Sequence, residues 1–404
     1  MSGRDPHEHG RTATSLELLF DLVFVVAVGQ AASQFAHLLA AGHVVAGIGA
    51  FAFAMYAIVW GWINFSWFAS AFDTDDWPQR LATMVQMVGV TILGLGLAPV
   101  FHSLDAGHAP DNHLIVAGYV VMRVAMVFQW LRAAKQSPRY RPACLAYATA
   151  IIIAQIGWVF TLVMHLDLTQ SILAYAVLML VELGGPYVAE TFFHGTPWHA
   201  HHIAERYSGF AIIALGEGVV GTVASLSAIV EESGWTLDAA LVAIAGMGLT
   251  FGMWWAYFLT TPGEILHVHR RRAFKWGYGS IVVFAAIAAT GAGLDVAALF
   301  IEHKASIGAV GAVLAVSIPV ALYLLSVYWL YSALYAEVHW FHLVLLAITA
   351  AVIVAAPLLA AAGVSMTLCL LVVMLAPAVS VIGYELHGYR HVSQALQRTL
   401  DTAP

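Results

Sequence analysis

Twelve continuous apolar runs, each about as long as a bilayer is thick, follow one another along this chain. A helix needs about 20 mostly apolar residues to span the hydrocarbon core of a membrane. The runs are rich in Leu, Ala, Val, Ile and Gly and do not alternate in polarity, which predicts helices and not barrel strands. They cover residues 17–40, 45–70, 81–101, 114–134, 142–164, 170–188, 205–229, 237–260, 274–299, 307–332, 339–362 and 365–386. We therefore predict an all-α, polytopic membrane protein with about twelve transmembrane helices.

The composition agrees with this class and excludes others. Of the 404 residues, 61% are hydrophobic and 10% charged, whereas soluble domains carry about a quarter charged residues. The net charge of −7 comes without a basic stripe, which excludes nucleic acid as a partner. The two cysteines, Cys144 and Cys369, lie far apart in apolar runs and encode no disulfide framework or paired-cysteine metal site. The partners expected are the lipid bilayer, a small ion or solute, and, for a homo-oligomer, further copies of the chain.

The basic residues predict the orientation in the membrane. An even number of spans places both termini on one side, and fourteen of the sixteen Lys and Arg residues flank spans on that side. Lys304 lies on the opposite side, and Arg123 lies within a span. Because basic residues concentrate in cytoplasmic loops, we expect both termini in the cytoplasm.

Weak internal similarity predicts two six-helix repeats of the same orientation. Residues around Gly29 and Gly216, Trp62 and Trp255, and three further pairs of positions match in the same order at separations of 187 to 199 residues. The expected organisation is an N-terminal tail (1–16), a first half (17–188), a His-rich linker (189–204), a second half (205–386) and a C-terminal tail (387–404). Related halves of this kind are common among secondary transporters.

Ionisable residues inside the spans are the first candidates for a site, since such residues normally face a cavity or a partner. Glu17 and Asp21 share one face of the first span at a spacing of four residues. Glu217 lies between two glycines in the seventh span, and Arg123 in the fourth span could pair with Glu217 or Asp21. A fixed ion pair that joins the halves, or helix-start carboxylates at the first span, would explain the same residues without function.

Further polar residues accompany these four. Glu182 precedes Gly184, Gly185 and Pro186, a pattern typical of a broken helix that exposes carbonyl groups, or simply of the end of a span. Neutral hydrogen-bonding side chains within the spans complete the predicted ion or substrate site: Gln30, Asn64, Gln86 and Gln129.

The linker predicts a weak metal site. His199, His202 and Glu205 recur every third residue and would form one edge of a helix able to bind zinc or a similar ion, although the spacing matches no standard zinc signature. A pH-responsive hinge and a plain amphipathic linker are the alternatives. The residues indicate no particular cofactor.

A cluster of acids follows the second span. Asp73, Asp75 and Asp76 precede Pro78 and Arg80. They could hold a divalent cation, or one or two of them could cap the next helix while Arg80 and the basic stretch 270–272 pair with the rest.

These motifs resemble those of the bacterial low temperature requirement A family. The resemblance rests on Leu16-Glu17-Leu18-Leu19-Phe20-Asp21, on the segment from Trp62 to Asp76, and on Glu205-Arg206-Tyr207 leading to Gly216-Glu217. Tyr207-Ser208 stands where the family usually has Phe-Gly. The resemblance implies a multi-pass inner-membrane protein linked by name to growth in the cold, and it transfers no substrate or catalytic residue.

Three functions compete at this point. The first is a secondary transporter or ion-conducting protein with a polar site between the halves, centred on Asp21, Arg123 and Glu217. The second is an intramembrane enzyme or metal-binding protein that uses the His/Glu cluster, which the lack of any catalytic motif disfavours. The third is a membrane component of cold adaptation that transports nothing.

Overall fold

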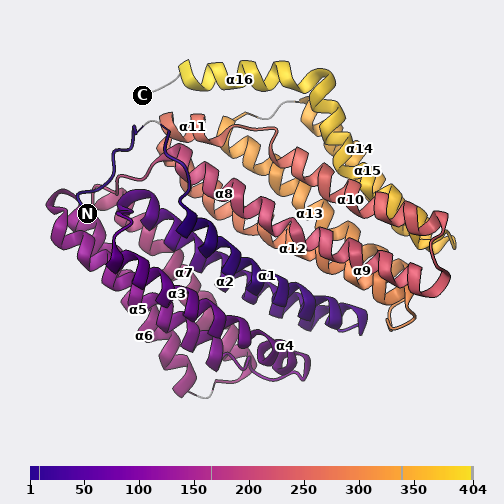
Figure 1. The fold of residues 1–404 in the computed structure, drawn as a ribbon, viewed down its shortest axis with the longest axis horizontal. Helices are drawn as coiled ribbons and strands as arrows, with labels where there is room; N and C mark the ends of the chain where they lie inside the picture. Colours follow the sequence, from indigo (N-terminus) through magenta and orange to yellow (C-terminus); the bar gives the residue numbers. More distant parts are fainter. Residues whose placement is uncertain (9, 165, 338–339, 402–404) are drawn as a thin grey trace. The chain divides into compact units, whose positions relative to one another are not determined.

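The computed structural model describes residues 1–8, 10–164, 166–337 and 340–401, and every regular element among them is helical (Figure 1). The first part of the chain forms α1 (Ser15–Ala40), α2 (Val44–Phe72), α3 (Trp77–Leu95), α4 (Leu97–Asp105), α5 (His113–Gln136), η1 (Pro138–Tyr140), α6 (Arg141–Val163) and α7 (Leu168–Phe192). The second part forms α8 (Ala200–Ala214), α9 (Gly216–Ser233), α10 (Leu237–Tyr257), α11 (Pro262–Val268), η2 (Arg270–Arg272), α12 (Ala273–Ile301), α13 (Ala309–Tyr335), α14 (Trp340–Ala361), α15 (Met366–Gly383), η3 (Tyr384–Gly388) and α16 (Tyr389–Asp401).

Twelve helical stretches within the described residues are long and apolar enough to cross a membrane, which confirms the predicted number of spans. They are Ser15–Ala40, Val44–Phe72, Trp77–Asp105, His113–Gln136, Pro138–Val163, Leu168–Phe192, Ala200–Glu231, Leu237–Val268, Arg270–Ile301, Ala309–Tyr335, Trp340–Ala361 and Met366–Asp401. The chain is therefore a multi-pass membrane protein that contacts the lipid bilayer. The seventh stretch begins at Ala200 and not at residue 205 as predicted, because a helix can start among the interfacial His residues of the linker.

The chain forms two compact units. Unit 1 comprises Met1–Ala31 and Gly49–Arg206, and unit 2 comprises Ala32–Ile48 and Tyr207–Pro404. The division near residue 206 lies close to the predicted start of the second half. The turn between α1 and α2 belongs to unit 2, where the backbone N–H of Ser306 donates to the carbonyl of Ala40 at 2.7 Å.

Within unit 1, α3, α5, α6 and α7 pack as successive neighbours (Figure 1). Small residues permit the closest approach: a Cβ atom added at Gly89 of α3 would lie 2.6 Å from the carbonyl oxygen of Gly118 in α5. Backbone contact of this kind is the usual way for helices to associate in lipid, where burial of apolar side chains gives no advantage.

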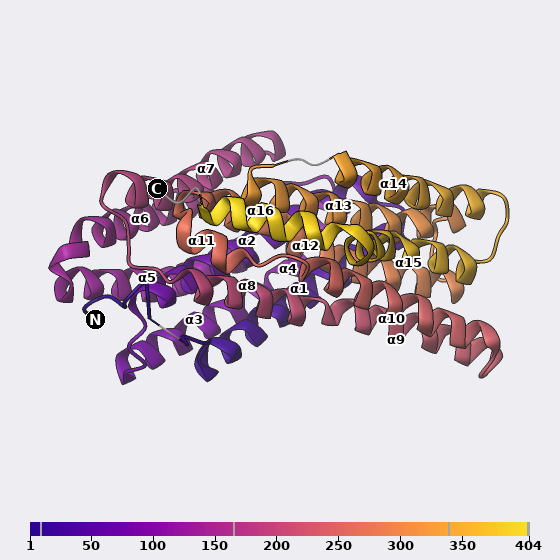
Figure 2. The same cartoon turned by 90° about the horizontal axis from the view of Figure 1, so that it is seen from above.

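Within unit 2, α10, α12, α13, α14 and α15 run side by side, as Figures 1 and 2 both show. The chain turns after α15 at the π-helix η3 and continues as α16 in a different direction (Figure 1). The face of α16 that packs on the unit carries Val392, Ala395 and Thr399, while its Arg and Gln side chains are exposed. This pattern is typical of a helix that lies along a membrane interface.

Candidate functional site

Two helices of unit 1 each present a pair of polar side chains spaced four residues apart. Glu17 and Asp21 come from α1, and His202 and Arg206 come from the first two turns of α8. A spacing of four residues places two side chains on one helix face, so each side chain of one pair can face a side chain of the other pair. All four side chains are buried, with exposures of 2% for Glu17 and 0% for Asp21. We call these four residues the acid–arginine cluster.

Arg206 lies between the two carboxylates of the cluster. Its Nη2 donates to Oδ1 of Asp21 at 2.5 Å. Its Nη1 lies 2.9 Å from Oε1 of Glu17, although neither of these two atoms makes a well-aligned hydrogen bond. His202 adds a contact of 3.2 Å from its Nε2 to Oε1 of Glu17. The guanidinium thus bridges both acids while part of its hydrogen-bonding capacity stays unused.

An aromatic wall surrounds the cluster on the side of α2. The indole N–H of Trp62 donates to Oδ1 of Asp21 at 2.6 Å. The rings of Trp62 and Phe65 lie 5.8 and 5.6 Å from the guanidinium carbon of Arg206, within cation–π distance. Phe20 stacks on Phe65 with ring centroids 3.7 Å apart. These rings exclude lipid and water, so every charge of the cluster has to be balanced by protein groups or a bound ion.

Local structure at the start of α1 holds Glu17 in place. The backbone N–H of Thr14 donates to Oε2 of Glu17 at 2.8 Å, and the N–H of Glu17 donates to the Thr14 hydroxyl at 3.2 Å. This reciprocal arrangement is a capping box, which satisfies two backbone donors at a helix start. The helix-start explanation offered for the two acids therefore accounts for Glu17 but not for Asp21, which is one turn further into the helix.

The cluster is short of one positive charge. Two carboxylates face one guanidinium, and His202 balances the second carboxylate only when it carries a proton. Several atoms also lack a hydrogen-bond partner in the described structure, namely Oδ2 of Asp21, Nε of Arg206 and Nδ1 of His202. An uncompensated buried charge costs several kcal/mol, even after relaxation of the protein. The arrangement therefore favours uptake of one proton.

Neighbouring charges outside the spans do not remove this imbalance. Arg11 and Asp73 both interact electrostatically with Glu17 and carry opposite charges. Arg11 donates to the carbonyl oxygens of Ser70 and Ala69. Burial lowers the pKa of Arg11 to about 10, so it stays charged near neutral pH. Burial and the nearby Glu17 carboxylate raise the pKa of Asp73.

Arg123 lies in a second polar group of unit 1 and not in the acid–arginine cluster. Its Nη2 lies 3.7 Å from Oε2 of Glu182 and donates to the hydroxyl of Tyr119 at 2.9 Å. The predicted pair of Arg123 with Asp21 is therefore wrong. Arg206 takes that place because α8 packs its polar face directly on α1.

Three of the four neutral residues of the predicted site are buried, and the fourth is exposed. Asn64, Gln86 and Gln129 are buried in unit 1, and the Asn64 amide donates to the carbonyl of Trp60 at 2.8 Å. Both amide atoms of Gln129 lack a hydrogen-bond partner within the described structure. Gln30 is exposed and has no place in the cluster.

Glu217 lies in unit 2, in the first turn of α9, where the helix restarts after a break at Leu215. It is close enough to Asp295 of α12 for the two carboxylates to interact. Gly291 allows this approach, because a Cβ atom there would lie 2.8 Å from backbone atoms of Glu217. Both acids are half-buried. Sequence reasoning missed Asp295, although a single acid within the apolar stretch 273–301 was a visible signal.

The three residues of the predicted metal site face different partners. His199 Nε2 lies 2.8 Å from the carbonyl oxygen of Glu8, His202 faces Glu17, and a carboxylate oxygen of the exposed Glu205 accepts from the backbone N–H of Ala13 at 3.3 Å. Within the described residues, no group of three or more His, Cys, Asp or Glu side chains could hold a metal ion. Burial lowers the pKa of His199, which favours its neutral form.

The acids after α2 have separate roles within unit 1. Asp76 caps α3 by accepting from the backbone N–H of Gln79 at 3.1 Å, and it also pairs with Arg132. Asp75 accepts two hydrogen bonds from Arg80, at 2.9 and 2.8 Å. Asp73 accepts from the side-chain amide of Gln79 at 2.6 Å. The sequence pointed to capping and to the Arg80 pair but not to Arg132.

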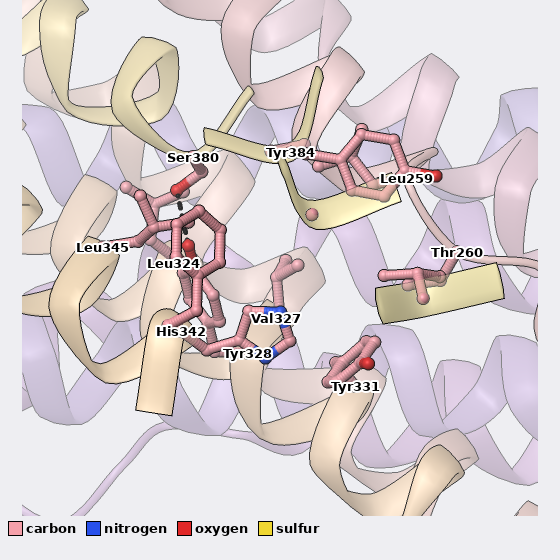
Figure 3. A pocket seen from close by; sticks show the side chains of 14 residues that line it. Leu259, Thr260, Leu324, Val327, Tyr328, Tyr331, His342, Leu345, Ser380 and Tyr384 are labelled. Carbon is pink, nitrogen blue, oxygen red and sulfur yellow. Dashed lines mark hydrogen bonds between the residues drawn. The ribbon is translucent and has the colours of Figure 1, made fainter. Parts of the chain in front are cut away.

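The pocket shown in Figure 3 lies in unit 2 and contains none of the predicted site residues. Its walls are mostly aliphatic and aromatic, and the hydroxyl of Tyr328 donates to the Ser380 hydroxyl at 3.1 Å (Figure 3). The residues labelled around it are Leu259, Thr260, Leu324, Val327, Tyr328, Tyr331, His342, Leu345, Ser380 and Tyr384. Such a lining suits an apolar molecule and gives a charged substrate few partners.

Comparison with known proteins identifies relatives but no solved structure. Residues 12–377 match the family described as bacterial low temperature requirement A protein (LtrA). An uncharacterized protein of Rhizobium meliloti (strain 1021) is 26% identical over 252 residues, which cover 60% of this chain and 57% of that protein. The similarity to this curated relative thus spans somewhat more than half of the relative's length. No solved structure matches the chain significantly.

Proposed function

This chain belongs to the bacterial low temperature requirement A family, and from that premise we propose that it is a proton-coupled secondary transporter of the cytoplasmic membrane. The proton site is the acid–arginine cluster, and both termini face the cytoplasm. The observation that carries the proposal is the missing positive charge among Glu17, Asp21, His202 and Arg206.

A proton fits this deficit better than a larger ion. The cluster is enclosed by aromatic rings, and its side chains are already in contact, so that a metal cation would have to displace Arg206 or Trp62. A proton needs no additional space. Ionisable groups inside spans commonly act as proton relays in transporters for this reason.

The proposal includes an alternation between two states of the cluster. In the protonated state the cluster is neutral and stable in the low-dielectric interior. After loss of the proton it carries a net negative charge, which favours rearrangement of α1 against α8. A transporter needs this coupling between occupancy and conformation. The predicted duplication into two six-helix halves supplies a familiar framework for such a movement.

The test is proton flux in liposomes that contain the purified protein and an enclosed pH-sensitive dye. A pH gradient is imposed in the presence of Na⁺, K⁺ or Li⁺ salts, each in turn. We expect flux above that of protein-free liposomes and loss of that flux in Asp21→Asn. The matched control is Asp238→Asn, which changes an exposed aspartate in the first turn of α10 and should leave the flux unchanged.

Two outcomes would overturn the proposal. One is wild-type protein that moves protons no faster than empty liposomes under all three salts. The other is a folded Asp21→Asn protein with wild-type flux.

A further inference from the structure

Glu182 of α7 is a buried carboxylate that the acid–arginine cluster does not use. It is 7% exposed, and its Oε1 accepts a hydrogen bond from the indole N–H of Trp158 at 3.2 Å. Its Oε2 lies 3.7 Å from Nη2 of Arg123, which is too far for a hydrogen bond. Neither Oε2 of Glu182 nor Nε of Arg123 has a hydrogen-bond partner in the described part of the chain. Charge is balanced here, but hydrogen bonding is not.

Two small cavities of unit 1 meet at this carboxylate. The first is mainly aromatic and is lined by Phe53, Tyr56, Tyr119 and Trp158 in addition to Glu182. The second is more polar and is lined by Trp60, Asn64, Ile151, Tyr147 and Pro186, again with Glu182. The first has room for about one or two water molecules and the second for about one, and the second offers the polar partners that a buried water needs.

Pro186 increases the polarity of the second cavity. Proline has no backbone N–H, so the carbonyl of Glu182, four residues earlier in α7, loses its helical donor. In a membrane-spanning helix such a freed carbonyl is usually satisfied by a neighbouring side chain or by water. The side chain and the backbone of Glu182 therefore both favour water in the same place.

Beyond this cavity a chain of hydrogen bonds leads to the end of α7. The hydroxyl of Tyr147, which lines the cavity, donates to Oε1 of Glu190 at 3.0 Å. Glu190 in turn accepts from the hydroxyl of Thr196 at 2.6 Å and from its backbone N–H at 3.2 Å. Thr196 belongs to the segment between α7 and α8, outside the apolar stretches. The chain thus connects the cavity beside the buried acid with Glu190, which is half-buried near the end of α7.

We propose that Glu182 is a second proton-binding site, which exchanges protons with the aqueous phase. The path consists of a water in the second cavity, beside Asn64, then the Tyr147 hydroxyl and Glu190. Once Glu190 is protonated, its O–H donates to the Tyr147 oxygen, and the Tyr147 hydroxyl turns from Glu190 toward the cavity water. The Glu190 proton then passes to the Tyr147 oxygen as the original Tyr147 proton passes to the water. That water then gives one of its own protons to Oε2 of Glu182. Each relay group receives one proton and releases one, so only one proton moves in net terms.

The groups around Glu182 suit this role. Arg123 keeps its charge throughout and stabilises the deprotonated form, as does the indole donor of Trp158. Tyr56 and Trp60 of α2 also face the carboxyl, and Tyr119 of α5 is held by Arg123. No other carboxylate contacts Glu182 in the described structure, so its protonation is separate from that of Asp21. The inference goes beyond the proposed function and does not depend on transport.

The test is infrared spectroscopy of the full-length protein in lipid nanodiscs. The carboxyl band of Glu182 is identified as the pH-dependent signal that disappears in Glu182→Gln, and its exchange is followed after transfer to heavy water. We expect Tyr147→Phe to slow this exchange about 100-fold, because a positioned proton-transfer group contributes about that factor or more. Tyr175→Phe removes a hydroxyl from the aromatic cluster around Trp158, away from the relay, and should exchange at the wild-type rate.

Different results would overturn this inference and the proposed function. Absence of any band that depends on Glu182, or unchanged exchange in a folded Tyr147→Phe protein, refutes the relay. Asp21→Asn should keep the Glu182 band, because the two sites are separate. Wild-type protein without proton flux but with normal Glu182 exchange would contradict only the proposed function.

Discussion

Replacing Arg206 by methionine tests the balance of charge in the acid–arginine cluster. The substitution keeps most of the side-chain volume but removes the guanidinium that contacts Glu17 and Asp21 at 2.9 and 2.5 Å. Both carboxylates are then buried without a permanent counter-charge, because their exposures are 2% and 0%. Removal of one partner from a buried ion pair costs about 3–5 kcal/mol, so we expect Arg206→Met to lower the free energy of unfolding at neutral pH by about that amount.

The matched control is Arg80→Met. Arg80 also contacts a carboxylate, that of Asp75, at 2.8 Å, but the two side chains are 61% and 51% exposed. Exposed ion pairs contribute at most about 1 kcal/mol because water screens them. The same chemical change should therefore have a much smaller effect at this position.

Equilibrium unfolding in mixed detergent micelles, followed by far-ultraviolet circular dichroism, measures both effects. Adding Asp21→Asn to Arg206→Met should recover part of the lost stability, because the neutral amide needs no counter-charge. Our reasoning is refuted if Arg206→Met costs no more than Arg80→Met. It is also refuted if the effects of Arg206→Met and Asp21→Asn simply add.

Three further predictions concern single contacts. Hydrogen bonding to Arg132 lowers the pKa of Asp76 from 3.8 to about 2. The stabilising contribution of Asp76 is therefore full above the ordinary aspartate pKa and is lost as the pH falls toward about 2. An acid titration of stability should show this loss in wild type but not in Arg132→Met. Gly291→Ala should lower the free energy of unfolding by about 1–3 kcal/mol through overpacking, whereas Gly94→Ala, where nothing lies within 4 Å, should be neutral or slightly stabilising. Trp62→Phe removes a 2.6 Å donor to a buried carboxylate and should cost about 1–3 kcal/mol in the same unfolding assay.

The spans were predictable because the requirement behind them is local. Each helix that crosses a membrane must satisfy its own backbone hydrogen bonds and present about 20 apolar residues to lipid. The run of residues 114–134 therefore predicts α5 without knowledge of its neighbours, and the structure extends it only to His113–Gln136. The break at Leu215 was not predicted, because glycines on both sides of Glu217 are as compatible with a continuous helix as with an interrupted one.

The partners of the buried charges could not be predicted in the same way. Asp21 and Arg206 are 185 positions apart, and only the packing of α8 on α1 brings them together. The positive-inside rule assigned Arg206 to a flanking loop, since the rule counts charges and does not consider buried pairs. A usable signal was present all the same: His202 and Arg206 have the same spacing of four residues as Glu17 and Asp21. An acidic helix face and a basic helix face with the same residue spacing predict that the two helices pack against each other through these residues.

The proposed duplication has a consequence for the chemistry of the two halves. With the separation of 187 residues between Gly29 and Gly216, Asp21 corresponds to Ser208 and Glu217 corresponds to Gln30. Each half thus replaces the acid of the other by a neutral side chain. Gln30 is exposed, whereas Asp21 is fully buried beside Arg206. If the halves arose from one ancestor, they no longer share a polar site, and a proton bound at Asp21 in one half has no equivalent in the other. Substitution of Asp21 and of Glu217 should therefore affect proton flux differently, which a symmetric pair of sites would not allow.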